Sequence, residues 1–385
     1  MPMPTPLKTQ SQPVYFCRME QAIIWSIPAL ALAALIEFIV SVRRGRKTYR
    51  GNDTLANLSQ GVISQLIGAC TPLLQIGIYT LVFSYLGHAL ELPFWHTWYG
   101  FALAVVMFDF CEYWLHRVGH EVSVFWAAHV VHHQSEELNI CTALRQESQN
   151  AVLGWPFYLP MAIAGVPPEV FAFSLLLVQY YQIWAHTEQV GKLGWLDGVF
   201  TTPSNHRVHH AVNDCYLDRN YGGLFVLWDR LFGTYAAETE RCVFGTRSPV
   251  RSFNPLRAIT QVYGDLARDC WHAQRWQDKI KVWFMPPGWR PADVAERFPK
   301  PRFDVNRKTY DPPATRMALG LATVVFLSLS VASGFVLWNA ETMDYGSLLL
   351  CTAVLIAGFC GVGELLERGR RPPLAWPDGS SGIPS

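Results

Sequence analysis

Three short histidine clusters stand out in this 385-residue chain and contain eight of its 12 histidines. They read His116-Arg-Val-Gly-His120, His129-Val-Val-His132-His133 and His206-Arg-Val-His209-His210. Residues three and four apart share one helix face at about 5–6 Å, and a neutral imidazole nitrogen binds iron, copper or zinc. Each cluster can therefore present its ligands to a metal ion as a unit.

The number of imidazoles favours two redox-active ions over zinc. Catalytic zinc usually takes three protein ligands and structural zinc takes four, whereas eight or nine nitrogens suit two ions. The HExxH string of metalloproteases is absent, since Glu121 after His120 is followed by Val-Ser-Val. Two metals with open positions that change oxidation state can activate dioxygen. We therefore expect an O2-dependent oxidoreductase that yields a hydroxylated or desaturated lipid.

Two residues outside the clusters are further candidates. His186 follows a long apolar stretch and reads either as a ninth ligand or as a packed polar residue. Asp109 lies seven residues before His116, on the same helix face and inside an apolar segment, where a carboxylate needs a partner. We expect Asp109 to accept a proton from a ligand imidazole and so fix the tautomer of that ring.

The segments that must position these residues read as membrane helices. The chain is 50% hydrophobic and 16% charged, and its net charge of +1 gives no reason to expect nucleic acid as a partner. Five segments read as membrane-spanning helices, the last two as a pair, because they are long enough for an apolar core of about 30 Å. These segments are 22–42, 61–86, 98–115, 317–338 and 346–363.

Breaks in the helical pattern decide on which side the clusters lie. We expect a turn within 121–127, because one straight helix would aim the first two clusters apart. The apolar stretch 151–185 is interrupted by Val166-Pro-Pro168, which favours two short helices folded back as a hairpin. The basic residues from Arg43 to Arg50 place the end of the first span in the cytoplasm. All three clusters then lie on the cytoplasmic face, so we expect an all-α, multi-pass transmembrane helical bundle with a cytoplasmic histidine-rich metal-binding cap.

After the clusters, the stretch 256–271 has apolar residues at helical spacing, including Leu256, Ile259 and Tyr263. It predicts an amphipathic helix that lies on the bilayer or against the metal-binding part.

The three clusters resemble the histidine boxes of the membrane fatty acid hydroxylase and sterol desaturase superfamily. Within it, further stretches resemble the family of alkylglycerol monooxygenases, and the likeness extends from about residue 50 to about 365. These stretches are Glu136-Glu-Leu-Asn-Ile-Cys-Thr-Ala-Leu-Arg-Gln146, Asn205 with the third cluster, Asn220-Tyr-Gly-Gly223, Trp228-Asp-Arg-Leu-Phe-Gly-Thr234 and Pro286-Pro-Gly-Trp289.

The resemblance implies a di-iron monooxygenase of ether lipids. The eight clustered histidines would ligate two iron ions, Glu121 would be a catalytic residue because the family motif includes it, and the carbon next to the ether oxygen would be hydroxylated. Tetrahydrobiopterin is implied as the reductant, and an external electron donor is required because no nicotinamide or flavin domain is visible.

Four parts are expected along the chain. They are an N-terminal segment with the first transmembrane helix (1–56), a fatty acid hydroxylase-like catalytic domain (57–240), a cytoplasmic amphipathic linker region (241–315) and a C-terminal transmembrane pair with a tail (316–385).

Two alternatives remain open from the sequence. One is a sterol or fatty-acyl hydroxylase or desaturase that draws electrons from a separate carrier. The other is a membrane metal-binding or transport protein, although transporters place their ligands near the midplane between repeats and these clusters fall at one surface.

Overall fold

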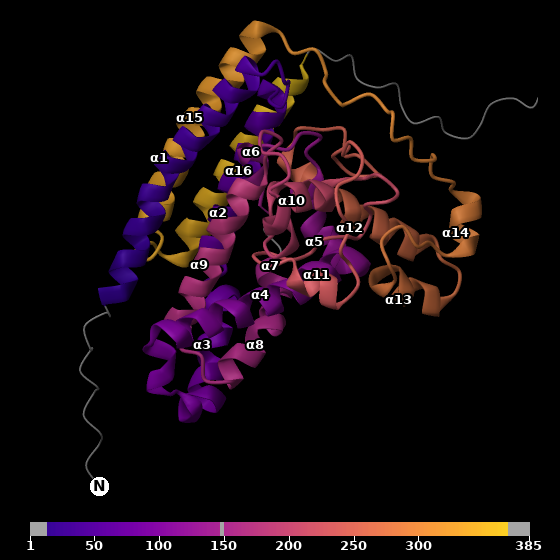
Figure 1. The fold of residues 1–385 in the computed structure, drawn as a ribbon. Helices are drawn as coiled ribbons and strands as arrows, with labels where there is room; N and C mark the ends of the chain where they lie inside the picture. The colour runs from indigo at the N-terminus through magenta and orange to yellow at the C-terminus, as the bar shows by residue number, and fades with distance from the viewer. Residues whose placement is uncertain (1–13, 147–149, 369–385) are drawn as a thin grey trace, which may run out of the picture.

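The computed structural model describes residues 14–146 and 150–368, which form helices and loops (Figure 1). In this described part the only β-pairing consists of isolated bridges at Phe200–Phe225 and Ala211–Phe244, so the expected all-α class is confirmed. The ends of the expected outer parts, 1–13 and 369–385, lie outside the described residues. The helices are α1 Val14–Arg43, α2 Gly51–Cys70, α3 Ile78–Val82, α4 Trp98–Glu121, α5 Ser123–His133, α6 Ile140–Ala143, α7 Asn150–Leu153, α8 Trp155–Ile163, α9 Pro168–Ala185, α10 Pro203–His210, α11 Leu227–Leu231, α12 Pro255–His272, α13 Trp276–Phe284, α14 Ala292–Arg297, α15 Arg316–Asn339 and α16 Tyr345–Glu367.

Helix α4 is the central element that carries the first cluster. Thr97 caps its start at Trp98 by accepting a hydrogen bond from the Gly100 amide, and the helix packs against α5, α8 and α9. It ends at Glu121, and Val122 is extended before α5 starts at Ser123. The expected turn within 121–127 is confirmed, and it folds α5 back against α4.

The apolar stretch 151–185 is divided as expected. Helix α8 ends at Ile163, Gly165 has a φ of +81°, and Pro167 is extended before Pro168 opens α9. A proline at the first helical position fits because that residue needs no amide donor. Both helices pack against α4, and α9 runs back to deliver His186 beside the other histidines.

The expected single segment 61–86 is wrong, because the helix breaks in its middle. Helix α2 ends at Cys70, and Thr71 leaves the helical region with φ −129° and ψ 39°. Pro72 causes the break, since proline lacks an amide hydrogen and disfavours the helical conformation of the residue before it. The chain then continues as short α-helical and π-helical turns over η1 Leu73–Gly77, α3 and η2 Phe83–Gly87.

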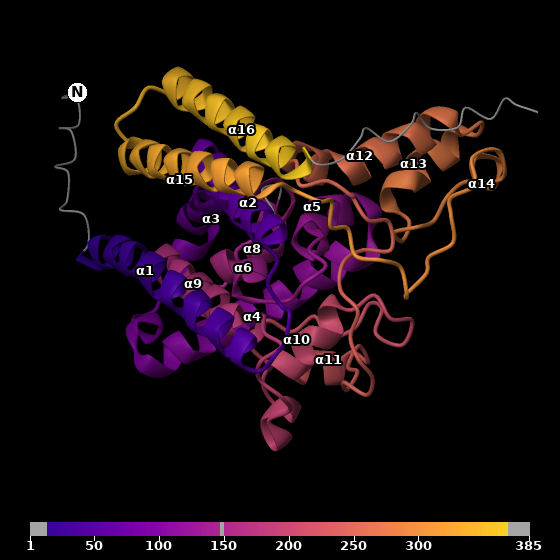
Figure 2. The ribbon, with the colours of Figure 1, turned by 90° about the horizontal axis from the view of Figure 1, so that it is seen from above.

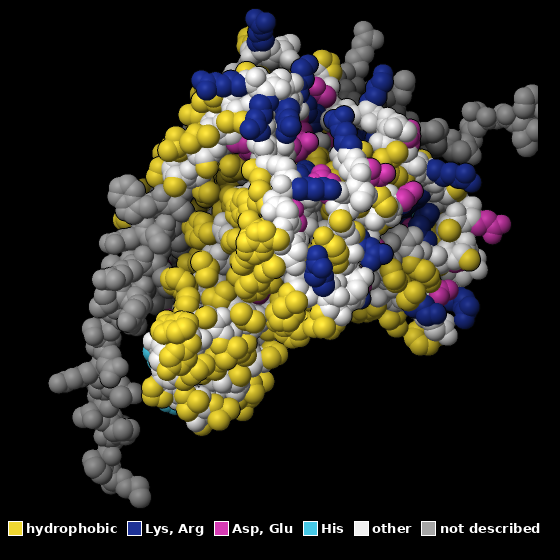
Figure 3. Space-filling model, in the orientation of Figure 1, with side chains coloured by type: hydrophobic (Ala, Val, Ile, Leu, Met, Phe, Trp, Pro, Cys, Tyr) yellow, Lys and Arg dark blue, Asp and Glu magenta, His cyan; other side chains and the backbone are white. Residues whose placement is uncertain are grey.

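Two described helices, α15 and α16, are long and apolar enough to cross a membrane, and they indicate a membrane protein. They lie side by side and pack on α2 (Figure 2). Their outward side chains are strongly exposed, with Val331 76%, Phe335 71% and Trp338 75% accessible. In Figure 3 hydrophobic side chains cover the left and lower part of the molecule, while Lys, Arg, Asp and Glu gather over the upper and right part.

The expected amphipathic helix at 256–271 corresponds to α12, which packs against α5 and is followed by α13. Helix α13 exposes Trp276, Ile280 and Phe284 at intervals of four residues, so these side chains share one face. The exposed indole of Trp271 precedes this face. One side of the α12–α13 pair therefore supports the histidine-bearing α5, and α13 presents an unpartnered apolar face.

Candidate metal centre

The structure brings nine histidines together in two adjacent groups. In each group, one nitrogen from every ring lies within 4.8 Å of the others. The first group consists of His116, His120, His129, His133 and His209, and the second consists of His132, His186, His206 and His210. All eight clustered histidines and the expected ninth, His186, thus meet in one centre.

Helical spacing explains how one cluster serves both groups. His129 and His133 on α5 are four residues apart and face the first group, while His132 between them turns to the second. Helix α10 does the reverse: His206 and His210 face the second group and His209 faces the first. Helices α5 and α10 therefore each supply histidines to both groups, whereas the cluster on α4 supplies only the first group.

Most of these histidines are buried. Eight of the nine residues are only 2–8% exposed, all except His116. Burial, followed by the neighbouring imidazoles, holds the pKa values of His133, His206 and His210 well below their usual range. Neutral imidazoles keep a nitrogen lone pair, which is the form that binds a metal ion.

The hydrogen bonds of His132 and His186 show that their facing nitrogens carry lone pairs. His132 Nδ1 lies 3.0 Å from the Arg145 carbonyl, and His186 Nδ1 lies 2.9 Å from the Gln182 carbonyl. Because a carbonyl oxygen only accepts, both Nδ1 atoms carry the proton and both Nε2 atoms are bare. The two Nε2 atoms are nevertheless 3.1 Å apart. Facing lone pairs repel unless a cation sits against them, so this donor set fits a bound metal.

The first group fits a metal by a second observation. The Nε2 atoms of His120 and His209 are buried and accept or donate no hydrogen bond within the described residues. The His209 ring is anchored by its other nitrogen, 3.2 Å from the Arg219 carbonyl. A buried nitrogen without a hydrogen-bond partner is costly, and a metal ion satisfies it.

Two buried arginines hold the histidine-bearing segments in place. Arg145 is 5% exposed and donates to the Val131 carbonyl at 2.6 Å and to Gln134 Oε1 at 2.8 Å, while its own carbonyl anchors His132. Arg207 on α10 forms a two-pronged ion pair with Glu238 and donates to the Thr187 carbonyl, next to His186. Such forked contacts fix orientation as well as charge.

Asp109 does not accept a hydrogen bond from a ligand imidazole, which corrects the expected contact. Its carboxylate accepts from the Leu224 amide at 2.6 Å, the Phe225 amide at 3.1 Å and Trp228 Nε1 at 2.8 Å. The physical reason is distance along α4, because seven residues place Asp109 about 10 Å from His116 along the helix axis.

The link from Asp109 to the metal centre is indirect. The loop that Asp109 holds carries the Tyr221 carbonyl, which lies 2.8 Å from His116 Nδ1. Asp229 fixes the start of the same loop through the amides of Tyr221 and Gly222. Asp229 does not pair with its neighbour Arg230, whose guanidinium stacks on Tyr235.

Glu121 lies beside the centre but belongs to neither histidine group. Its carboxylate is 2.9 Å from Arg117 Nε, and its side chain is 43% exposed. Asp218, with a φ of +56°, places a carboxylate oxygen 3.8 Å from His120 Nδ1.

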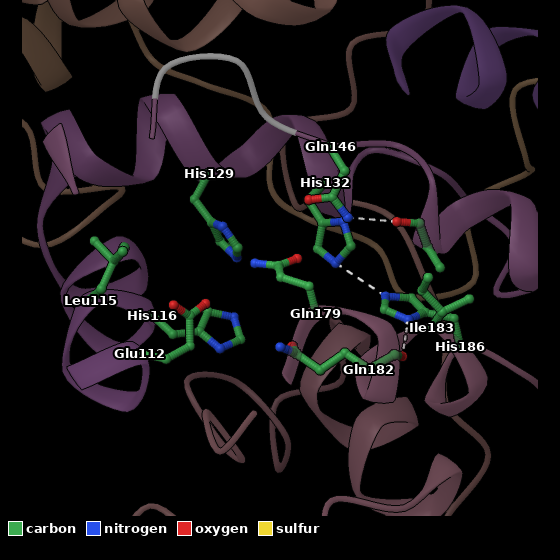
Figure 4. A pocket seen from close by; sticks show the side chains of 12 residues that line it. Glu112, Leu115, His116, His129, His132, Gln146, Gln179, Gln182, Ile183 and His186 are labelled. Atoms are coloured by element: carbon green, nitrogen blue, oxygen red, sulfur yellow. Dashed lines mark hydrogen bonds between the residues drawn. The ribbon is translucent and has the colours of Figure 1, made fainter. Parts of the chain in front are cut away.

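A small cavity of about 40 Å³ opens between the two groups (Figure 4). His116 and His129 of the first group and His132 and His186 of the second all line it. Its other polar lining residues, Glu112, Gln146, Gln179 and Gln182, were not among the site residues expected from the sequence. Glu112 lies within the apolar helix α4, and Gln179 and Gln182 lie within the apolar helix α9. A polar side chain inside an apolar helix is a sequence signal by which all three can be found.

The fatty acid hydroxylase family model matches residues 101–234, a range that contains all nine histidines of the centre. The family match therefore defines an oxidoreductase of the lipid hydroxylase class, with two histidine groups that could hold metal ions. The chain is 36% identical over 343 residues to an alkylglycerol monooxygenase of Xenopus tropicalis, covering 89% of this chain and 76% of that relative. It is 33% identical over 354 residues to the human alkylglycerol monooxygenase, again covering 89% and 76%. The chain belongs to the alkylglycerol monooxygenase family.

A more distant relative is an ornithine lipid hydroxylase of Rhizobium tropici, 26% identical over 237 residues, or 57% of this chain and 70% of that protein. No solved structure matches the chain.

Proposed function

We propose that this protein is a membrane-bound di-iron monooxygenase that hydroxylates the carbon next to the ether oxygen of alkylglycerol lipids. The observation that carries the proposal is the convergence of nine imidazoles into two adjoining groups around one cavity. The names of its relatives supply the substrate. Each histidine group would hold one iron ion, with His186 as a full ligand of the second.

The proposed reaction consumes one O2, two electrons and two protons for each ether lipid. One oxygen atom enters the C–H bond beside the ether oxygen, and the other leaves as water. The resulting hemiacetal breaks its C–O bond to give an aldehyde and glycerol. Two iron ions, when bound, supply the redox chemistry that activates O2. An external donor of the tetrahydrobiopterin type would supply the electrons.

The chain's own residues have three tasks in this reaction. The buried Nδ1 contacts to the carbonyls of Arg145, Gln182 and Tyr221 fix the ring orientations. The loop held by Asp109 positions His116, and Glu121, which follows His120, remains a candidate catalytic residue. The cavity admits the substrate to both groups and limits the access of water.

We also propose a multi-pass arrangement with the histidine centre at the cytoplasmic face. The apolar pair α15–α16 and the exposed apolar side chains of α1, including Leu32 and Ile36, support burial in lipid. The basic residues between α1 and α2 support the orientation. On this arrangement, the exposed indoles of Trp271 and Trp276 would lie at the depth of the lipid headgroups.

The test is purification without oxygen, metal analysis and an O2-consumption assay. We expect about two iron ions per chain, and aldehyde formation from an O-alkylglycerol with tetrahydrobiopterin. Turnover of a sterol or acyl lipid with a ferredoxin or cytochrome would favour the related hydroxylase or desaturase activity. Bound metal without any oxygen consumption would favour a metal-binding or transport protein.

A further inference from the structure

Two glutamines interrupt the apolar sequence of α9 and face the cavity. Gln179 and Gln182 are three residues apart, and His186 follows four residues later, so all three lie along one side of the helix end. Figure 4 shows both amides pointing into the space between His116 and Glu112 on one side and His132 and His186 on the other. The two amides therefore sit between the two histidine groups.

The protein itself does not satisfy these amides. No hydrogen bond joins the Gln179 side chain to any other described residue. Gln182 Nε2 makes only a 3.5 Å contact with the Val178 carbonyl of the preceding turn. Both side chains are half-buried and line the cavity, so their amides are open to hydrogen bonds from a ligand that enters it.

Glu112 adds a fixed acceptor to the same cavity. It lies four residues before His116 on α4, and its carboxylate accepts a hydrogen bond from the Tyr158 hydroxyl. Leu115 and Ile183 supply apolar wall on either side. The cavity thus combines two amides, which donate and accept, with one carboxylate, which accepts.

This combination matches two neighbouring hydroxyl groups, because each hydroxyl both donates and accepts a hydrogen bond. We propose that Gln179 and Gln182, with Glu112, bind the two free hydroxyls of the glycerol part of the substrate. The inference rests on the proposed function and names its specificity-determining residues. Held there, the glycerol would leave its ether-linked carbon beside His116, His132 and His186.

The test uses Gln179→Met and Gln182→Met, made separately in the full-length, iron-loaded protein. Methionine keeps the length of glutamine and removes its amide hydrogen bonds. Two ligands of equal chain length are compared: an O-alkylglycerol, and the alkyl methyl ether that lacks both hydroxyls. Binding is measured without oxygen, as Kd, and kcat/KM is measured with oxygen.

Each variant should bind the alkylglycerol about tenfold more weakly, the scale of one lost hydrogen bond to a neutral group, and should bind the methyl ether unchanged. Iron content and Tm should stay at wild-type values. Leu177→Ala, on the exposed side of α9 at 42% accessibility, is the matched control and should alter neither ligand.

An equal loss of affinity for both ethers, or an unchanged preference in both variants, would overturn the assignment. If the wild-type protein turns over neither ether, the result contradicts the proposed function itself. The glycerol subsite, which rests on that function, is then contradicted too. The two substitutions are made in separate proteins. If one variant loses iron, the binding data of the other still test the assignment.

Discussion

At the scale of single residues, replacing the proposed ligand His186 tests whether the two histidine groups bind separate iron ions. Its Nε2 lies 2.9 Å from that of His206 and 3.1 Å from that of His132, so it stands at the centre of the second group. We predict that His186→Gln lowers the iron content from about two ions to about one per chain. Activity should fall about 100-fold or more, because even residues that only support metal ligands typically cost 10–100-fold.

Metal analysis and O2 consumption check this prediction. His88→Gln is the control, because that side chain is 71% exposed and belongs to neither histidine group. A His186→Gln protein that retains two iron ions would show that His186 is only a packed polar residue.

Asp109 should act on the metal centre through the loop that it holds. Asn at this position offers one carbonyl oxygen and an NH2 group to the Leu224 and Phe225 amides and to Trp228, and three donors cannot all be satisfied. We predict that Asp109→Asn destabilises the fold by about 1–3 kcal/mol, the cost of a buried polar group left without a partner. Iron retention should also fall, because the Tyr221 carbonyl that orients His116 moves with the loop.

Thermal unfolding and metal analysis measure these two effects. Unchanged Tm, iron content and activity would show that the Asp109 carboxylate serves neither the loop nor His116.

How much of this site the sequence predicts depends on how far apart the contacting residues lie along the chain. The spacing of His129, His132 and His133 is local, so it was sufficient to predict ligands. The partners of Asp109 lie more than 100 residues away in the chain, and no local pattern could identify them. Gln179 and Gln182 do give a local signal, since polar amides are rare in an apolar helix. This signal alone does not tell which cavity the amides line.

At the scale of elements, prolines and caps decide where the helices stop. The proline pair after Val166 correctly predicted the break between α8 and α9. Pro72 breaks the segment 61–86 in the same way, since α2 ends at Cys70 and Thr71 leaves the helical conformation. Hydropathy alone does not detect such a break, because the apolar character continues on both sides of Thr71.

The turn between α8 and α9 should depend on Gly165. Its φ of +81° disfavours any side chain, and a Cβ there would lie 2.5 Å from the Leu90 carbonyl oxygen. We predict that Gly165→Ala destabilises the protein by about 1–3 kcal/mol, the usual cost of a strained backbone position. It should also lower activity, because α9 delivers His186, Gln179 and Gln182.

Denaturant or thermal unfolding would measure the change. Gly264→Ala is the matched control, because a Cβ on that glycine of α12 meets no atom within 4 Å. Equal stability of the two variants would contradict the proposed strain at Gly165.

At the scale of the whole molecule, the first helix is tied to the catalytic part. Glu37 on α1 is 6% exposed and accepts hydrogen bonds from the Ile140 amide and from the Thr187 hydroxyl, next to His186. Arg50 before α2 pairs with Glu137 at 2.6 Å. These contacts join residues about 90 to 150 positions apart, so no local pattern in the sequence could predict them.

The proposed orientation gives the two ends of α4 opposite exposures. Helix α4 has 24 residues and is about 36 Å long, enough to separate its ends across an apolar core of about 30 Å. Leu90, which is 54% exposed, lies before the N-terminal end of α4. Cys215, an exposed free cysteine, follows the third histidine cluster in the sequence. A membrane-impermeant maleimide should therefore label Leu90→Cys on intact cells and Cys215 only after permeabilisation.

The background for this labelling is the Cys215→Ser protein, which carries every other cysteine of the chain. Labelling of Cys215 on intact cells would reverse the proposed orientation and place the histidine centre outside. Labelling of both positions from one side would show that α4 does not cross the bilayer.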